Sequence, residues 1–344
     1  MKLLPVFLFA ATLAATALAD DGQWITYEGK DGPGKGKRIV FLAGDEEYRS
    51  EEALPMLAKI LSQRHGFTST VLFSISKESG DIDPNTPDNE PGIEALDRAD
   101  LVITSLRYRR WPDEQMKHFA DYVKAGKPVI GLRTSTHAFN GIKGDFAPFN
   151  AFGKKVYGEG WVSHWGRHKS EATRGVIEGG AKDDVLLRGV NDLFGDTDVY
   201  EAYPPADAKI LVRGVVLKGM KPGDEPADYK KKRATDKQEQ GVNDPAMPVV
   251  WTRVNDNEFG TGNKVLCTTL GSATDLQNEG LRRLIVNAAF SFTGLEVPAQ
   301  ANVEYVDAFK PLFYGFNGGR KSLKVSDHEL GKTLPEGAAP EGKK

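Results

Sequence analysis

The residues best suited to chemistry follow a short apolar run at positions 128–132. This run predicts a buried strand that ends in a polar bend made of Arg133, Thr134, Ser135 and His137. In an open, mostly parallel sheet, ligands bind outside the carboxyl ends of the strands. We therefore predict His137 as a general acid or base, since an imidazole can take up and release a proton near neutral pH. Arg133 is predicted to stabilise developing negative charge, as on an enolate beside a keto group.

Two further histidines, His164 and His168, lie four positions apart, and with His137 they make up three of the six in the chain. If they share a face, a third imidazole and a carboxylate such as Glu201 would complete a zinc-type ligand set. The alternative is that these rings bind substrate or pack on nearby tryptophans. Glu201 and Asp45 are also candidates to orient His137 or to share its proton. No cofactor is certain, and the metal prediction is zinc or another divalent ion at His164 and His168.

Charged and aromatic residues follow other predicted strands and would open at the same edge of the sheet. A site with carboxylates, guanidiniums and rings suits a polyhydroxylated or anionic small molecule, held by charged hydrogen bonds and stacking. For the arginines after the third strand, surface ion pairing is the alternative, and for Asp275 it is helix capping. The candidate substrate-binding residues are Glu47, Tyr48, Arg107, Trp165 and Asp275.

The elements that must position these residues are predicted from hydrophobic periodicity and capping signals. In the first half, four strands alternate with helical segments, which calls for a parallel sheet with right-handed crossovers. These strands are expected at 38–43, 68–73, 101–105 and 128–132, with helices at 50–65, 93–98 and 112–125.

The second half is less regular and reads as additions to the same sheet. Strands are expected near 170–177, 208–212, 215–218, 248–253 and 264–270, with a helix from 278 to about 292. The long charged segment 218–247 predicts a surface loop. Its basic run, residues 230–233, is predicted to be solvated. After residue 295 periodicity is lost, so 296–344 is predicted as an irregular C-terminal extension with a disordered tail.

Length and composition fit a globular protein with a sizeable core, because the 344 residues are 40% hydrophobic and 27% charged. Residues 1–19 have a charged start, an apolar core and small residues before the predicted cleavage after Ala19. This pattern predicts a secretory signal peptide, and hence a periplasmic or extracellular protein. The alternative, an uncleaved anchor, is disfavoured because the apolar run is short for a bilayer span. No later segment predicts a membrane span.

The charge balance also limits the partners. A formal net charge of −3 disfavours nucleic acid or an anionic membrane as the main partner. We expect a small-molecule carbohydrate instead, and the oligomeric state does not follow from the sequence.

Five segments together carry a family resemblance: 45–52 (DEEYRSEE), 131–137 (GLRTSTH), 164–168 (HWGRH), 198–201 (DVYE) and 278–288 (NEGLRRLIVNA). In combination, over roughly residues 38–295, they resemble the ThuA-like (trehalose-utilisation) proteins, which are similar in fold to class I glutamine amidotransferases. The resemblance implies an α/β fold: a flavodoxin-like three-layer sandwich with a mostly parallel central sheet. It also implies a link to carbohydrate breakdown, including that of oxidised (3-keto) sugars.

The amidotransferase reaction itself is not expected, because it needs a histidine-activated cysteine at the bend after the strand. Leu132, Arg133 and Thr134 occupy that bend, and Cys267 belongs to a different predicted strand. The first hypothesis is therefore an exported hydrolase, lyase or isomerase that acts on glycosides or 3-keto sugars through histidine and carboxylate groups. The second is a non-catalytic sugar-binding or scaffold protein. A serine or threonine hydrolase is disfavoured, since the Gly-x-Ser-x-Gly pattern is missing.

Overall fold

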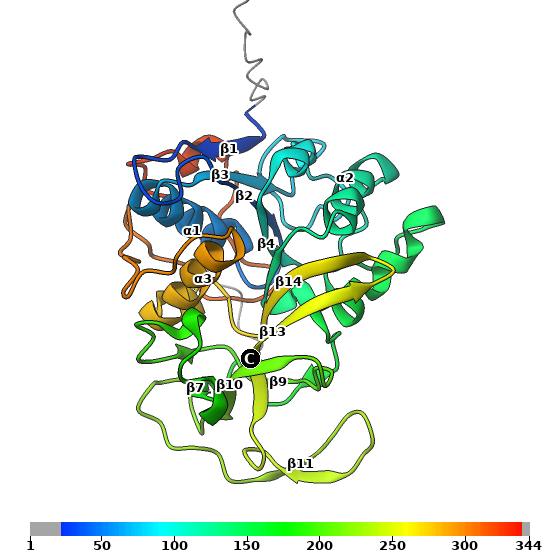
Figure 1. Cartoon of the computed structure of the whole chain (residues 1–344), viewed down its shortest axis with the longest axis vertical. Helices are drawn as coiled ribbons and strands as arrows, with labels where there is room; N and C mark the ends of the chain where they lie inside the picture. The colour runs from blue at the N-terminus through cyan, green and yellow to red at the C-terminus, as the bar shows by residue number, and fades with distance from the viewer. Residues whose placement is uncertain (1–21, 339–344) are drawn as a thin grey trace, which may run out of the picture.

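The computed structural model describes residues 22–338 as an α/β fold built on one large mixed sheet (Figure 1). The predicted signal peptide and the last six residues lie outside the described residues. The strand order is β1-β3-β2-β4-β5-β14-β13-β10-β7-β8. Its first-half strands are β1 (Trp24–Tyr27), β2 (Arg38–Gly44), β3 (Thr68–Phe73), β4 (Leu101–Leu106) and β5 (Val129–Leu132). The others are β7 (Thr173–Ile177), β8 (Phe194–Gly195), β10 (Lys209–Val216), β13 (Met247–Asn257) and β14 (Gly260–Thr268).

The prediction of a mostly parallel sheet is wrong, because only one half of the sheet is parallel. Strands β3, β2, β4, β5 and β14 pair in parallel, whereas β1, β13, β10, β7 and β8 all pair antiparallel. A parallel connection needs a crossover of about a dozen residues or more. Only residues 258 and 259 separate β13 from β14, so these two strands must form a hairpin.

Within the parallel half, the spatial order corresponds to one of the two common doubly wound orders, 2-1-3-4-5. The strand order reverses between β2 and β4, and this switch point is where ligands bind in such sheets. The flavodoxin-like three-layer sandwich as a whole stays a prediction.

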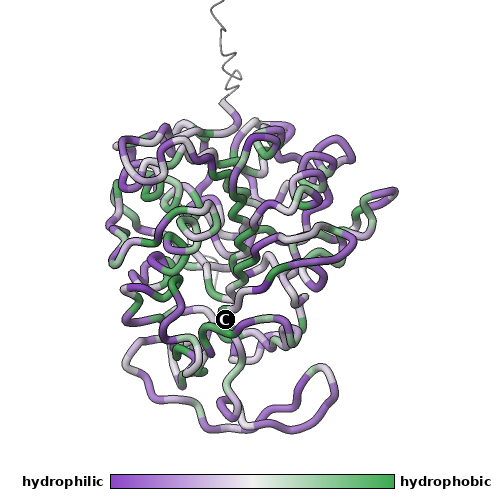
Figure 2. The backbone as a smooth tube through the Cα atoms, viewed as in Figure 1, coloured by the Kyte–Doolittle hydropathy of each residue, from purple (hydrophilic) through white to green (hydrophobic). Residues whose placement is uncertain are grey.

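Helices cover both faces of the parallel half, because its strands are apolar on both sides. Ile39 and Phe41 of β2 belong to the core shared with α1 (Ser50–His65) and α3 (Glu279–Phe292). Val40 and Leu42 belong to the opposite core, with α2 (Asp113–Lys124). Figure 2 shows the hydrophobic stretches concentrated in the central strands. Within residues 22–338, no helix combines the length and hydrophobicity that a membrane span requires.

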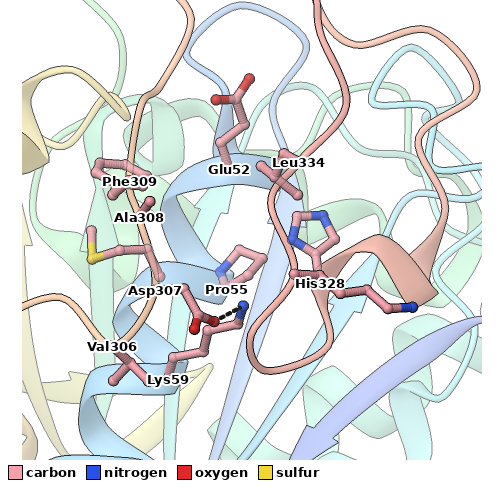
Figure 3. A pocket seen from close by; sticks show the side chains of 11 residues that line it. Glu52, Pro55, Lys59, Val306, Asp307, Ala308, Phe309, His328 and Leu334 are labelled. Atoms are coloured by element: carbon pink, nitrogen blue, oxygen red, sulfur yellow. Dashed lines mark hydrogen bonds and ion pairs between the residues drawn. The ribbon is translucent and has the colours of Figure 1, made fainter.

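The C-terminal extension, described as far as residue 338, contacts α1 through Asp307 and Arg320. Lys59 of α1 forms a 2.6 Å ion pair with Asp307 of the extension, beside the buried His328 (Figure 3). The cavity enclosed there measures about 30 Å³, which is room for water but not for a sugar. In open α/β sheets, ligands bind at the carboxyl ends of the parallel strands.

Two strand pairs stand outside the main sheet. A two-residue pair joins β6 (Ser163–His164) to β9 (Tyr200–Glu201), and a hairpin joins β11 (Lys230–Lys232) to β12 (Glu239–Gly241). The first of these pairs carries one of the predicted site histidines.

Candidate active site

The centre of the site is a buried carboxylate, Asp198, that sequence reasoning did not single out. Its Oδ1 accepts hydrogen bonds from Arg133 Nη2 and His168 Nδ1, each at 3.0 Å, and its Oδ2 accepts one from His164 Nδ1 at 2.8 Å. Burial alone would raise the pKa of Asp198. The Arg133 charge and the two histidine hydrogen bonds outweigh burial and hold this pKa well below its usual range. Asp198 is therefore ionised at neutral pH.

Arg133 is fully buried and serves as the counterion of Asp198. Its guanidinium lies 3.7 Å from the ring centroid of Tyr200 and 4.6 Å from that of Tyr48. Its Nη1 also donates to the backbone carbonyls of Asp198, at 2.8 Å, and Thr269, at 2.7 Å. With a side-chain exposure of 0%, the guanidinium does not reach a bound substrate, so the predicted direct role of Arg133 on an enolate does not fit this geometry.

The backbone near the site is strained at the positions that follow three parallel strands. Arg49 after β2, Tyr108 after β4 and Arg133 after β5 have φ values of 60°, 51° and 46°. Non-glycine residues in this left-handed region cost about 1–3 kcal/mol each and cluster at functional sites. Arg49 also occupies the N-cap position of α1, where its side chain forms no capping hydrogen bond.

The two histidines on Asp198 differ in what their second ring nitrogen contacts. A carboxylate only accepts hydrogen bonds, so both rings must carry a proton on Nδ1. Nε2 of His168 lies 3.2 Å from Glu47 Oε1, whereas Nε2 of His164 has no hydrogen-bond partner within the described part of the chain. Partial burial opposes protonation of His168, but its hydrogen bonds to Asp198 and Glu47 outweigh this and raise its pKa. Contacts with two carboxylates thus favour the cationic form of His168, whereas Nε2 of His164 is open; the two ring centroids lie 4.5 Å apart.

Partly exposed rings continue from His164 and form what we call the aromatic rim. Trp161 lies 4.9 Å from His164 and 5.1 Å from His137, and His137 lies 5.0 Å from Tyr108, all between ring centroids. Desolvation of the His137 ring, helped by nearby cations, lowers its pKa well below the usual value. Its one hydrogen-bond contact in the described chain is Thr136 Oγ1, at 3.1 Å. The structure therefore places His137 in the rim and not on a carboxylate.

The C-terminal extension completes the surroundings of the histidines, which the sequence did not indicate. The guanidinium of Arg107 lies between the rings of Tyr108 and Phe316, at 4.6 and 4.9 Å. The Tyr314 ring lies 5.7 Å from His168. Glu47 connects the two sides, because its Oε2 is 3.8 Å from Arg107 Nε. Predicted residues Glu47, Tyr48, Arg107, Arg133, His137, His164 and His168 are thus brought together by direct or one-step contacts.

Three predicted or considered residues lie close by but stabilise turns. Asp45, fully buried, accepts hydrogen bonds from the backbone N–H groups of Glu47 and Tyr48 and from the Thr134 hydroxyl. Burial, with the charge of Glu46, raises its pKa to about 6. Asp275 accepts from Thr197 and from backbone N–H groups at 271 and 272. The Ser135 hydroxyl donates to the Thr104 carbonyl of β4. The hydroxyls of Thr134 and Ser135 are therefore both engaged elsewhere and do not contact His137.

Two predicted residues face away from the site. Glu201 follows Tyr200 in β9, and successive side chains of a strand point to opposite faces. Its carboxylate accepts from Ser163, Tyr203 and the backbone of Ala234, not from a histidine. Trp165 has 0% exposure and donates from Nε1 to the Val242 carbonyl at 2.7 Å. A fully buried ring cannot stack on a substrate, so the predicted substrate contact of Trp165 is not available in this structure.

The described residues include a possible set of metal ligands. His164, His168 and Asp198 each offer one ligand atom, and these atoms lie within 4.8 Å of one another. Two imidazoles and a carboxylate suit zinc and related divalent ions. Cys267 is fully buried in β14, and burial raises its pKa well above the usual value. The thiol is therefore not an activated nucleophile.

Comparison with known proteins gives structural neighbours only. No protein-family model and no curated protein matches the chain. A solved structure described as a ThuA-like protein, from Parabacteroides merdae, is 17% identical, with 77% of this chain and 92% of that chain covered and a TM-score of 0.48. Another so described, from Bacteroides uniformis, is 13% identical, with 76% and 93% covered and a TM-score of 0.46. Both carry the name of the family that the five sequence segments resemble.

Proposed function

We propose that the chain is an exported carbohydrate-active enzyme, and that His164 is its general base and acid. The observation that carries the proposal is the Asp198–His164 pair. A buried carboxylate fixes the proton on Nδ1 and leaves Nε2 without a hydrogen-bond partner among the described residues, in a ring that lies 4.9 Å from Trp161. A base held in one tautomer by a carboxylate is the arrangement that histidine-dependent enzymes use for proton transfer.

The substrates we propose are glycosides or oxidised (3-keto) sugars, as the sequence resemblance implies. Partly exposed rings beside charged hydrogen-bonding groups are the surroundings in which a polyhydroxylated ring binds. If the substrate carries a keto group, Nε2 of His164 would take the proton from the neighbouring carbon, and the electron pair would move into an enolate. The cationic His168 ring, 4.5 Å away, would then stabilise this negative charge.

The test compares His164→Gln with a matched control elsewhere on the protein. His118 also contacts a carboxylate through Nδ1 at 2.8 Å, and its exposure of 34% is close to the 36% of His164. Purified mature protein would be assayed on 3-keto and unmodified glycosides. General acid–base catalysis contributes about 10²- to 10⁴-fold, so His164→Gln should lower kcat/KM by about that factor, while His118→Gln leaves it unchanged.

The outcomes separate the two hypotheses from the sequence. Equal activity of His164→Gln and the wild-type protein would refute the assignment of His164. Sugar binding by calorimetry without turnover of any glycoside would instead support the non-catalytic sugar-binding protein. The export proposal is tested separately, by N-terminal sequencing of the protein recovered from outside the cytoplasm, with Asp20 expected as the first residue.

A metal-dependent version of this function is the second candidate, and the clustered donors His164, His168 and Asp198 favour it. Against it stands Arg133, whose positive charge already contacts Asp198 Oδ1. Elemental analysis of the purified protein and zinc titration by calorimetry decide the matter. Binding that is lost in His168→Gln, together with loss of turnover in chelator, would support the metal. Full turnover in chelator without bound metal would support the proton-transfer version alone.

A further inference from the structure

Residues 218–247 form an arm that leaves the main sheet between β10 and β13. In Figure 1 this arm lies at the bottom of the view, where it carries β11. The sequence predicts that its basic run is solvated, and for two of three lysines this is correct. The side chains of Lys230 and Lys232 are exposed and form no hydrogen bond or ion pair with the described residues, whereas Lys231 between them is partly buried. Strand periodicity explains the difference, since the middle residue of three faces the opposite side.

Lys231 contacts the backbone of the segment that carries the proposed base. Its ammonium donates hydrogen bonds to the carbonyl of His164 at 2.8 Å and to that of Trp165 at 2.9 Å. It also lies 5.7 Å from the centroid of the Trp165 ring. Hydrogen bonds from a charged donor are stronger than neutral ones, so this single side chain restrains two consecutive peptide units.

The strand pairing of this segment is short, and beyond it the backbone N–H groups of Trp165 and Gly166 donate to the Val199 carbonyl. The β6–β9 ladder consists of two residue pairs, Ser163 with Glu201 and His164 with Tyr200. Other contacts hold the arm itself in place. Both carboxylate oxygens of Glu201 accept from the Ala234 N–H at 2.9 Å, and the Trp165 indole donates to the arm at residue 242. The arm therefore packs behind the strand whose front face presents the imidazole.

We propose that Lys231 is a positioning residue for His164, and that the arm 218–247 is the rear support of the site. This inference rests on the role of His164 proposed above. Lys231 does not touch the imidazole, but it fixes the peptide from which the imidazole projects. Without the ammonium, the 2.8 Å contact from His164 Nδ1 to Asp198 is no longer enforced, and the ring samples both tautomers.

The test reads the imidazole directly and needs no substrate. Long-range proton–nitrogen correlation spectra of the ¹⁵N-labelled mature protein report which ring nitrogen of each histidine carries the proton. The wild-type protein should give a fixed Nδ1-protonated signature for His164, assigned by its disappearance in His164→Gln. Lys231→Met should lose that signature and give averaged nitrogen shifts, while Lys230→Met and Lys232→Met, the matched controls from the same strand, should keep it.

Retention of the wild-type His164 signature in folded Lys231→Met would overturn the proposal, as would its loss in either control. If Lys231→Met lacks a native near-ultraviolet circular dichroism spectrum, Lys231→Gln takes its place, because the amide keeps an N–H donor while the charge is removed. Loss of the His164 signature in Lys231→Gln would then support the proposal, and its retention would overturn it. Because the spectra do not depend on turnover, a failure of the glycoside assay and a failure of this inference are distinguishable.

Discussion

The Asp198→Asn variant tests the electrostatic reasoning at the centre of the site. Asp198 and Arg133 both have 0% side-chain exposure and form a 3.0 Å ion pair. Removing one partner of a buried pair costs about 3–5 kcal/mol, because the other charge stays buried without compensation. The amide also fits poorly, since its oxygen can accept from only one side while three N–H groups converge on the carboxylate. We expect the free energy of unfolding to fall by about that amount.

The assay is urea unfolding followed by tryptophan fluorescence, with Arg133→Met and the double variant measured beside Asp198→Asn. If the two charges act as a pair, the double variant should be less destabilised than the sum of the single variants. Residues in direct contact show coupling energies of about 0.5–3 kcal/mol, and a value in the upper half of this range is expected here. Additive effects, or a loss below about 1 kcal/mol in Asp198→Asn, would refute the reasoning.

The pH dependence gives an independent check, with its sign set by the lowered pKa of Asp198. A carboxyl whose pKa is lower in the folded state stabilises the protein above its unfolded pKa, about 3.9, and this stabilisation is lost as the pH falls toward the folded value. The stability gap between wild-type protein and Asp198→Asn should therefore be large near pH 5, and it should narrow at higher pH as His168, whose pKa Asp198 raises, loses its proton. Below about pH 4 it should shrink, because the wild-type carboxyl becomes protonated. A gap that acid leaves unchanged would contradict the assignment.

Three further predictions concern single side chains. Because the pKa of His168 is raised, wild-type protein should be more stable than His168→Gln below about pH 6.5. Urea titrations at increasing pH should show this difference in the free energy of unfolding disappear. Burial raises the pKa of Glu90 to about 8, so Glu90→Gln should match wild-type stability near pH 4 and exceed it at pH 9; equal melting temperatures at pH 9 would count against this. Trp165→Phe leaves the Val242 carbonyl without its donor, so it should cost about 1–3 kcal/mol of stability and leave sugar affinity, measured by calorimetry, unchanged.

The parallel half of the sheet was predictable because its signals are local. The helix Ser50–His65 and the strand Thr68–Phe73 match their predicted bounds at both ends. Each has an apolar pattern long enough to show a period, and the helix ends at Gly66 in the left-handed conformation that glycine favours. Whether the later strands pair in parallel or antiparallel could not be predicted from such local signals. The apolar pattern of a strand carries no information about which neighbouring strand it pairs with.

The site was predictable in its residue types but not in its centre. Histidines at 137, 164 and 168 were singled out because imidazoles are rare in the chain, and the structure brings all three into one neighbourhood. Asp198 was missed because one acidic residue among many carries no local mark, although it lies in the DVYE segment of the family resemblance. Tyr314 was missed because the extension lacks periodicity. Glu201, from the same DVYE segment as Asp198, was chosen instead, and strand alternation directs it away from the histidines.

The site lies at the seam between the two halves of the sheet, and this explains why a buried ion pair is found there. Glu47 and Arg133 come from loops after the parallel strands β2 and β5, whereas His164, His168 and Asp198 come from connections of the antiparallel half. Neither half alone contains a base, an orienting carboxylate and a counterion. The Arg133–Asp198 pair joins the two sides, and its geometry is satisfied only when they are docked in register. Formation of the proposed proton-transfer site is therefore coupled to docking of the two halves, so we expect changes that loosen the seam to affect any activity before they unfold the parallel core.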